Sequence, residues 1–140
     1  RKEEQSGQIL RNFKGKRILL AEDNELNAEI AMELLGESGL ETEHVTDGIK
    51  CVETLKAKPE DYYDLILMDI QMPHMDGYEA TKIIRALNDP RSRIPIIAMT
   101  ANAFEEDRQR AFEAGMDAHI AKPIDVKILF STLVQVLGEE

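Results

Sequence analysis

The sequence predicts an α/β fold in which helices cover both faces of a five-stranded parallel sheet. Short apolar runs alternate along the chain with segments of helical periodicity. Continuous apolar runs are typical of strands buried on both faces, as in parallel sheets. Five strand–helix units with short connections make a doubly wound sheet, because right-handed crossovers place helices on both faces. The chain has 140 residues, enough for one such domain with its own core.

The predicted domain starts at residue 17. Residues 1–16 are polar and carry glycine at positions 7 and 15, so we expect a linker from a preceding domain, followed by a folded domain over residues 17–140. Strand and helix patterns alternate from residue 17 on, and they predict strands at 17–21, 41–45, 64–69, 95–99 and 117–121. The periodic segments that follow them predict helices at 25–38, 47–57, 77–88, 103–114 and 125–137.

Individual residues mark where these elements begin and end. Asn24 and Asp76 stand just before the first and third helices, where their side chains can act as N-caps. Gly39 and Gly115 follow the first and fourth helices, as expected at the C′ position. The loop before the fourth strand is bracketed by prolines at 90 and 95, so we expect it not to be helical.

Composition narrows the classes of function. The net charge of −10 argues against binding to nucleic acid, whose phosphates would repel the chain, and favours a basic partner or a divalent cation. Cys51 stands alone, which excludes an internal disulfide and suits a reducing compartment. No apolar stretch approaches the roughly 20 residues of a membrane span. We therefore expect a cytoplasmic domain without direct membrane contact, although its parent protein can be membrane-anchored.

Four of the apolar runs end in polar residues that suggest a reaction site. Glu22 and Asp23 follow the first run, and Asp69 follows the run from Leu65 to Met68. Thr100 and Lys122 follow the last two apolar runs. The carboxyl ends of parallel strands share one edge of the sheet, where open α/β folds place their chemistry. We therefore expect three carboxylates, a hydroxyl and an ammonium to converge there.

This set of charges suits phosphoryl transfer with Mg²⁺. Clustered carboxylates raise one another's pKa, and a hard divalent cation with oxygen ligands offsets their repulsion. Asp69 follows the central strand and is the best candidate nucleophile, since carboxylates form acyl phosphates. Lys122 and Thr100 could each bind one phosphoryl oxygen, because this reaction depends on positioning and charge neutralisation.

The motifs at these strand ends resemble those of the receiver domain of two-component response regulators. They are Leu20-Ala-Glu-Asp-Asn24, Met68-Asp-Ile-Gln-Met-Pro-His-Met-Asp-Gly77, Met99-Thr-Ala101 and Ala121-Lys-Pro123. The resemblance covers about residues 17–138 and implies a flavodoxin-like fold with strand order 2-1-3-4-5. It implies phosphorylation of Asp69 by a phosphohistidine donor, either a histidine kinase or a histidine phosphotransfer protein.

The same resemblance implies roles for the surrounding residues. Mg²⁺ would be held by Glu22, Asp23, Asp69 and the backbone carbonyl of Gln71. Thr100 and His119 would form a switch pair, and the Lys122–Pro123 peptide bond would be cis. The chain departs from the commonest pattern at Glu22, where many members have Asp, and at His119, where Tyr or Phe is frequent. His119 is therefore either a switch residue or a half-exposed strand residue.

Three functional alternatives remain open at this stage. The motif details favour a receiver domain within a hybrid sensor histidine kinase, and a stand-alone response regulator is the alternative. An aspartyl-phosphate Mg²⁺ phosphatase is less consistent, because that chemistry commonly uses a second acid at the position of Gln71. We expect a domain that catalyses its own phosphorylation and dephosphorylation rather than a turnover enzyme. Its oligomeric state is not indicated.

The first helix offers a second site. Helical periodicity of about 100° per residue centres the buried face on Asn27, Ala31 and Leu34. The apolar arc extends to Ala28 and Met32, which is wider than one core contact needs. It is either a broad core-facing stripe or a docking surface, next to the reaction site, for a phosphohistidine protein. His44 and His74 are expected to be surface residues and not ligands.

Overall fold

The computed structural model describes residue 13, residues 15–101 and residues 104–137. Five parallel strands form one sheet in the order β2-β1-β3-β4-β5, which confirms the predicted topology. The strands are β1 (Arg17–Ala21), β2 (Glu41–Val45), β3 (Leu65–Asp69), β4 (Ile96–Thr100) and β5 (Ala118–Ala121). Each predicted strand is present with boundaries within one residue of the expected ones.

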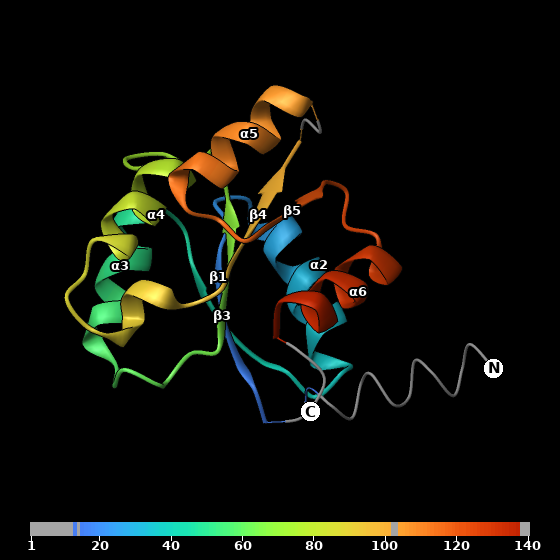
Figure 1. Ribbon diagram of the computed structural model, residues 1–140. Helices are drawn as coiled ribbons and strands as arrows, with labels where there is room; N and C mark the ends of the chain where they lie inside the picture. Colours follow the sequence, from blue (N-terminus) through green and yellow to red (C-terminus); the bar gives the residue numbers. More distant parts are fainter. Residues whose placement is uncertain (1–12, 14, 102–103, 138–140) are drawn as a thin grey trace.

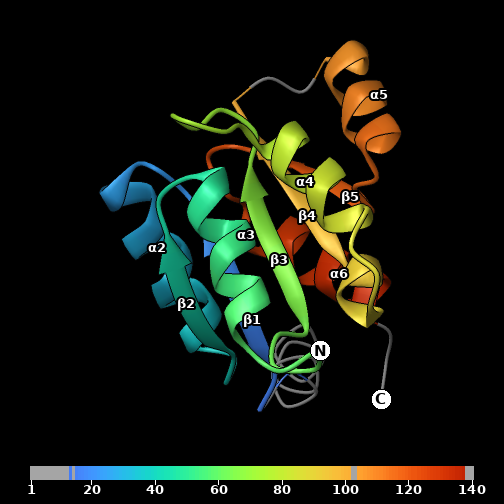
Figure 2. The same cartoon turned by 90° about the vertical axis from the view of Figure 1, so that its left-hand side faces the viewer.

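Within the described residues, five α-helices cover the sheet. They are α2 (Glu25–Gly36), α3 (Gly48–Ala57), α4 (Gly77–Arg85), α5 (Glu105–Ala114) and α6 (Val126–Leu137). Helices α2 and α6 lie on one side of the sheet, and α3 and α4 lie on the other (Figures 1 and 2). Helix α5 contacts α4 and β5 and lies toward the end of the sheet at which β4 points (Figure 1).

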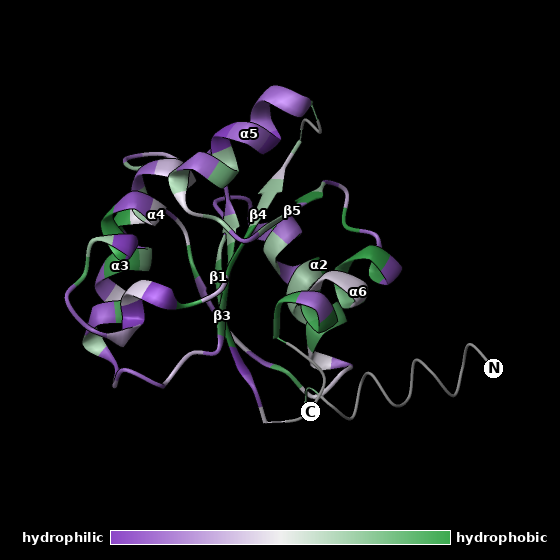
Figure 3. Ribbon diagram, viewed as in Figure 1, coloured by the Kyte–Doolittle hydropathy of each residue, from purple (hydrophilic) through white to green (hydrophobic). Residues whose placement is uncertain are grey.

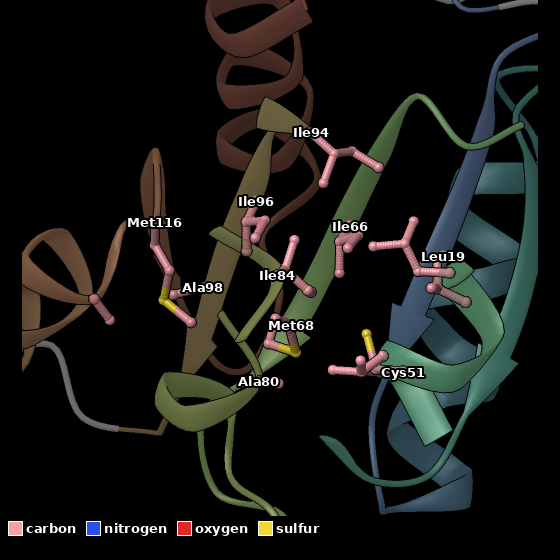
Figure 4. Packing of buried hydrophobic residues seen from close by; sticks show 14 of the residues in the cluster. Leu19, Cys51, Ile66, Met68, Ala80, Ile84, Ile94, Ile96, Ala98 and Met116 are labelled. Carbon is pink, nitrogen blue, oxygen red and sulfur yellow. The ribbon is translucent and has the colours of Figure 1, made fainter. Parts of the chain in front are cut away.

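Alternation along the buried strands divides the core between the two sides of the sheet. In β3, Ile66 and Met68 belong to the cluster under α3 and α4, whereas Leu65 and Leu67 belong to the cluster under α2 and α6. Successive strand side chains point to opposite faces, so a run buried on both faces must be apolar throughout. The hydropathy colouring shows green over much of the central strands and purple over most of α5 (Figure 3), and Figure 4 shows the first cluster around Ile66.

The caps confirm the boundary signals. Asn24 and Asp76 each accept a hydrogen bond from the backbone N–H three residues on, at 2.9 Å. Gly39 and Gly115 have φ of +87° and +108°, a left-handed conformation that glycine adopts without steric cost. After α2, the Leu40 N–H donates to the Leu35 carbonyl, as expected when Gly39 is at C′, although the regular helix ends at Gly36 and not at residue 38.

Two predictions for the third unit are wrong, the end of its helix and the absence of helix in the loop that follows. Helix α4 ends at Arg85 instead of residue 88, and the following loop contains a short 3₁₀ helix, Pro90–Arg93. Proline is tolerated at the start of such a turn, where its missing N–H has no partner to lose. The Arg85 guanidinium also donates to the carbonyl oxygens of Ser92 and Ile94, which holds this loop against the end of α4.

The predicted linker, residues 1–16, lies mostly outside the described residues. Phe13, which the prediction placed in the linker, is only 1% exposed and stacks on Phe130 of α6 at a ring-centroid distance of 6.2 Å. The packed structure therefore already includes residue 13. Within the described ranges, no helix is both long and apolar enough to span a membrane.

The buried face of α2 is rotated from the predicted one. Ala28, Ala31 and Leu35 are fully buried, whereas Asn27 and Leu34 are only partly buried. Rotation of about one residue is enough to bring Ala28 to the centre of the contact with the sheet. The broad core-facing stripe is therefore the correct reading for Ala28.

Candidate functional site

The four predicted strand ends meet at one edge of the sheet. Asp69 is the last residue of β3 and pairs in register with Met99, one residue before Thr100. Thr100 in turn pairs with Ala121, one residue before Lys122. Glu22 and Asp23 directly follow β1, the other neighbour of β3. The parallel sheet therefore brings together side chains separated by 100 residues of sequence.

The three acidic residues form one compact cluster. Glu22, Asp23 and Asp69 each offer a carboxylate oxygen, and these oxygens all lie within 4.8 Å of one another. Glu22 and Asp69 are buried, and Asp23 is exposed at the mouth of the cluster. A cavity of about 240 Å³ adjoins them and is also lined by Gln71, Ala101 and Lys122. This arrangement provides oxygen ligands and room for a small hydrated cation.

Lys122 neutralises part of this charge by bridging the two buried carboxylates. Its Nζ lies 2.9 Å from Glu22 Oε1 and 3.1 Å from Asp69 Oδ2. Burial raises the pKa of Asp69, and the charge of Glu22 raises it further, while Lys122 opposes both effects. Burial alone would lower the pKa of Lys122, but its hydrogen bonds to Glu22 and Asp69 raise it. Asp69 is thus a desolvated carboxylate held next to a fixed ammonium.

Thr100 and Gln71 complete the rim of the site. Thr100 is buried at the end of β4, and its carbonyl oxygen accepts a hydrogen bond from the Lys122 N–H at 2.8 Å. Gln71 is exposed on the loop after β3. Both residues, together with Asp23, line a second cavity of about 570 Å³ that extends to Tyr78 and Arg110. The predicted acidic, hydroxyl and ammonium groups therefore line two cavities that share Asp23 and Gln71.

The backbone around Asp69 is closely packed at a glycine. Gly77 begins α4, and its N–H donates to the Ile70 carbonyl oxygen at 2.9 Å. A Cβ atom at this position would lie 2.5 Å from the Asp69 carbonyl oxygen, which is far too close for van der Waals contact. Glycine at position 77 thus lets the start of α4 press against the residue that bears the central carboxylate. The Lys122–Pro123 peptide bond is cis, as predicted.

His119 is not part of the acidic cluster in this structure. It lines a separate cavity of about 370 Å³ between α5, β5 and α6, together with Arg108, Phe112 and Thr132. Its Nε2 is buried and has no hydrogen-bond partner among the described residues. Burial lowers the pKa of His119, and Arg108 adds to this effect. The His119 side chain is thus partly buried on β5, outside the acidic cluster.

The predicted docking residues on α2 differ in accessibility. Ala28 is 1% exposed and belongs to the core, so a protein partner cannot touch it, and its inclusion in a docking surface is wrong. Met32 is partly buried and packs against the same core cluster. Two large apolar residues that the prediction missed are exposed instead: Leu26 at 65% and Ile30 at 48%. Their i, i+4 spacing is visible in the sequence and places them on one face of the helix. The predicted buried face was rotated, so this exposed apolar face was not recognised.

His44 makes a backbone contact that was not predicted. Its ring Nε2 lies 2.7 Å from the backbone oxygen of Glu22. His74, by contrast, is exposed, as predicted. The strand order was the available signal for His44, because the end of β2 lies next to the end of β1 when the order is 2-1-3-4-5.

Relatives with the same sequence features are known. Residues 18–134 match the family described as "Response regulator receiver domain". The chain is 37% identical over 159 residues to histidine kinase 1 of Arabidopsis thaliana, a match that covers 91% of this chain but only 13% of that protein. It is 38% identical over 124 residues to the polar-differentiation response regulator DivK of Brucella ovis, covering 89% of this chain and 98% of DivK.

A solved structure shares both fold and sequence. It is the receiver domain of sensor histidine kinase PA1611 from Pseudomonas aeruginosa, with a TM-score of 0.79 and 41% identity. The match covers 89% of this chain and 99% of that one, whose active site cleft contains a coordinated magnesium ion. The family match spans most of the sequence, and the fold agrees with it. The chain therefore belongs to the response regulator receiver domains, which have a phosphoryl-accepting role in two-component signalling and occur both within hybrid histidine kinases and as stand-alone regulators.

Proposed function

We propose that this domain accepts a phosphoryl group on Asp69 from a phosphohistidine of a histidine kinase or a histidine phosphotransfer protein. The observation that carries the proposal is the position of Asp69. Its carboxylate is 5% exposed, belongs to a three-carboxylate cluster and lies 3.1 Å from Lys122 Nζ. A buried carboxylate with a fixed cation beside it is suited to receive a highly charged group, because the charge it gains is already partly compensated.

The residues of the cluster fit Mg²⁺. Three carboxylates against one ammonium leave a formal charge of about −2, which a divalent cation brings to about zero. Glu22, Asp23 and Asp69 would hold the ion, and the Gln71 backbone carbonyl is proposed as a further ligand on the strength of the family resemblance. The bound cation would supply charge neutralisation between the carboxylates and the incoming phosphoryl oxygens.

The transfer itself would be an in-line displacement at phosphorus. An Asp69 carboxylate oxygen forms the new O–P bond while the P–N bond to the donor imidazole breaks. The electron pair of that bond returns to the imidazole nitrogen. Lys122 Nζ and the Thr100 hydroxyl would each donate a hydrogen bond to a phosphoryl oxygen, and later attack by water on phosphorus would regenerate the Asp69 carboxylate.

We further propose that the phosphorylated state changes the environment of His119. The aspartyl phosphate carries about −2 on its phosphoryl group, which attracts the Thr100 hydroxyl. Movement of Thr100 toward the phosphate would leave room for His119, whose buried Nε2 is unpaired among the described residues, to turn toward the site. Such a change is a two-state switch biased by local charge.

The donor protein would dock on α2. Helix α2 begins two residues after Asp23, and its exposed Leu26 and Ile30 lie one turn apart, with Met32 at the edge of the core. Exposed apolar side chains next to a reaction site are typical of a protein-binding surface. Leu26→Glu is expected to slow transfer from a phosphohistidine protein at least tenfold while labelling by acetyl phosphate is unchanged. Equal transfer to the folded variant would exclude this surface, and Ile49→Glu on α3 is the control.

The parent protein is proposed to be a hybrid sensor histidine kinase. Histidine kinase 1 of Arabidopsis thaliana is a larger protein in which the matched region is only 13% of the length, and the residues before Phe13 are proposed to link this domain to a preceding one. The cytoplasm is the proposed location, since the single Cys51 is buried and unpaired. DivK, which the chain covers almost completely, supports a stand-alone regulator as the second candidate.

Incubation with acetyl phosphate and Mg²⁺, followed by intact mass measurement, tests the proposed function. We expect the chain to gain the mass of one phosphoryl group, whereas Asp69→Ala gains none. Beryllofluoride, which mimics the phosphoryl group, is expected to bind only when both Mg²⁺ and Asp69 are present. Labelling of Asp69→Ala, or labelling without a divalent cation, would contradict the proposal.

A further inference from the structure

His44 lies at the edge of the acidic cluster without belonging to it. It is the fourth residue of β2 and pairs in register with Leu20, so it sits beside the end of β1. Its Nε2 is 2.7 Å from the Glu22 backbone oxygen. A carbonyl oxygen can only accept a hydrogen bond, so Nε2 must carry the hydrogen and donate it. This contact fixes the neutral form of His44 as the Nε2–H tautomer.

The accepting oxygen belongs to the peptide group that joins Glu22 to Asp23. A peptide group is planar, so the orientation of the Glu22 carbonyl also sets the N–H and the Cα of Asp23. On the other side of Glu22, its own N–H donates to the Val45 carbonyl oxygen at 3.0 Å. Adjacent residues of β2 therefore hold Glu22 at both its amide and its carbonyl group.

The side chain of Glu22 connects this restrained backbone to the acidic cluster. Its Oε1 accepts from Lys122 Nζ at 2.9 Å, and its Oε2 accepts from the Asn24 N–H at 3.1 Å. A rotation about the Cα–C bond of Glu22 would turn the Glu22–Asp23 peptide and change where the Asp23 carboxylate lies relative to those of Glu22 and Asp69. Among the described contacts, the His44 ring is the group that opposes this rotation at the carbonyl.

We propose that His44 is a positioning residue for divalent-cation binding: its Nε2–H holds the Glu22–Asp23 peptide so that both carboxylates face Asp69. This inference rests on the proposed function, because it assigns the acidic cluster to a cation. His44 contacts neither the cation nor the phosphoryl group in this assignment. Outer groups that orient metal ligands typically change metal affinity by about 10–100-fold when they are removed.

The test compares His44→Leu with His44→Gln in the whole chain. Leucine removes the donor at similar size, whereas the glutamine side-chain amide restores an N–H at comparable reach. We expect His44→Leu to raise the half-saturating Mg²⁺ concentration for acetyl phosphate labelling about tenfold, with the rate at saturating Mg²⁺ within about twofold of the parent. His44→Gln is expected to recover most of the affinity, a rescue that loss of packing alone would not produce.

Thr42→Val is the matched control. Thr42 lies two residues before His44 on the same strand, and its buried hydroxyl has no hydrogen-bond partner among the described residues. We expect its Mg²⁺ dependence to equal that of the parent chain. An unchanged half-saturating Mg²⁺ concentration in folded His44→Leu would overturn the inference, as would failure of glutamine to improve on leucine.

An independent readout separates this inference from the proposed function. Nitrogen-15 NMR spectra of the imidazole report which ring nitrogen carries the hydrogen, and Mg²⁺-induced shifts of the Glu22 and Asp23 amides report binding without any phosphorylation. We expect the Nε2–H tautomer of His44 in the parent chain. In His44→Leu we expect weaker Mg²⁺ binding. An Nδ1–H tautomer would overturn the role of His44 even if Asp69 is labelled. Absence of labelling with the expected tautomer and Mg²⁺ shifts would instead overturn the proposed phosphoacceptor function alone.

Discussion

Replacement of Lys122 by methionine tests the electrostatic design of the site. Lys122 Nζ lies 2.9 Å and 3.1 Å from the two buried carboxylates of Glu22 and Asp69. At an effective dielectric constant of about 20, each pair contributes roughly 5 kcal/mol of attraction before desolvation is counted. The oxygens of the acidic cluster lie within 4.8 Å of one another. Their mutual repulsion is then at least about 3 kcal/mol per pair.

The net loss of stability is smaller than these gross terms. Removal of one partner from a buried ion pair typically costs about 3–5 kcal/mol, because the remaining charge is left uncompensated. The pKa of Asp69 is already raised by burial and by Glu22, and in Lys122→Met we expect it to rise further because the opposing effect of Lys122 is lost. The penalty is therefore present at high pH and disappears as the pH falls and the folded state takes up protons. We expect a loss of about 3 kcal/mol at pH about 8 without Mg²⁺ and much less at pH about 5.

Urea denaturation at both pH values, with and without Mg²⁺, measures this effect. Saturating Mg²⁺ is expected to restore part of the lost stability, since a ligand at 100 times its dissociation constant contributes about 2.7 kcal/mol. Lys127→Met is the control, because Lys127 is exposed on α6. A loss that is independent of pH, or equal to that of Lys127→Met, would refute the reasoning that Lys122 offsets buried carboxylate charge.

Three further predictions concern the same site. Asp69→Asn removes a carboxylate whose pKa is raised in the folded state. In urea denaturation without Mg²⁺ we therefore expect the free energy of unfolding to increase by about 1–3 kcal/mol at pH about 8, and this increase to vanish toward pH about 4. A decrease in the free energy of unfolding would contradict this. Gly77→Ala places a Cβ 2.5 Å from the Asp69 carbonyl oxygen. We therefore expect a loss of about 1–3 kcal/mol in denaturation experiments, and a neutral result would disprove the close contact. Thr100→Val is expected to slow acetyl phosphate labelling about 10–100-fold, with Thr100→Ser near the parent rate, and equal rates for all three would exclude a role for the hydroxyl.

The sheet was predictable because each buried strand is apolar on both faces. Runs such as Leu65–Met68 can be placed in few other environments, and the polar residue after each run marks the edge at which parallel strands end. The convergence of Asp69 with Lys122 follows from topology alone once the strand order is given. That is why residues so distant in sequence could be assigned to one site in advance.

The features that were not predicted depend on the rotation of helix α2 about its axis and on contacts of single side chains. A helix face is set by packing, and a rotation of about one residue separated buried Ala28 from exposed Leu26 and Ile30. The His44 contact requires the register of β1 against β2, which composition does not reveal. Phe13 was assigned to the linker because one aromatic residue in a polar segment gives no periodic signal, yet it stacks on Phe130.

Chemical location of the phosphoryl group on the chain tests the central claim most directly. After incubation with acetyl phosphate and Mg²⁺, borohydride reduces an aspartyl phosphate to homoserine, and mass spectrometric sequencing of peptides then identifies the position. We expect homoserine at residue 69 alone, and only when the divalent cation is present. Homoserine at another acidic residue, or a stable phosphoryl group on a hydroxyl or a histidine, would contradict it.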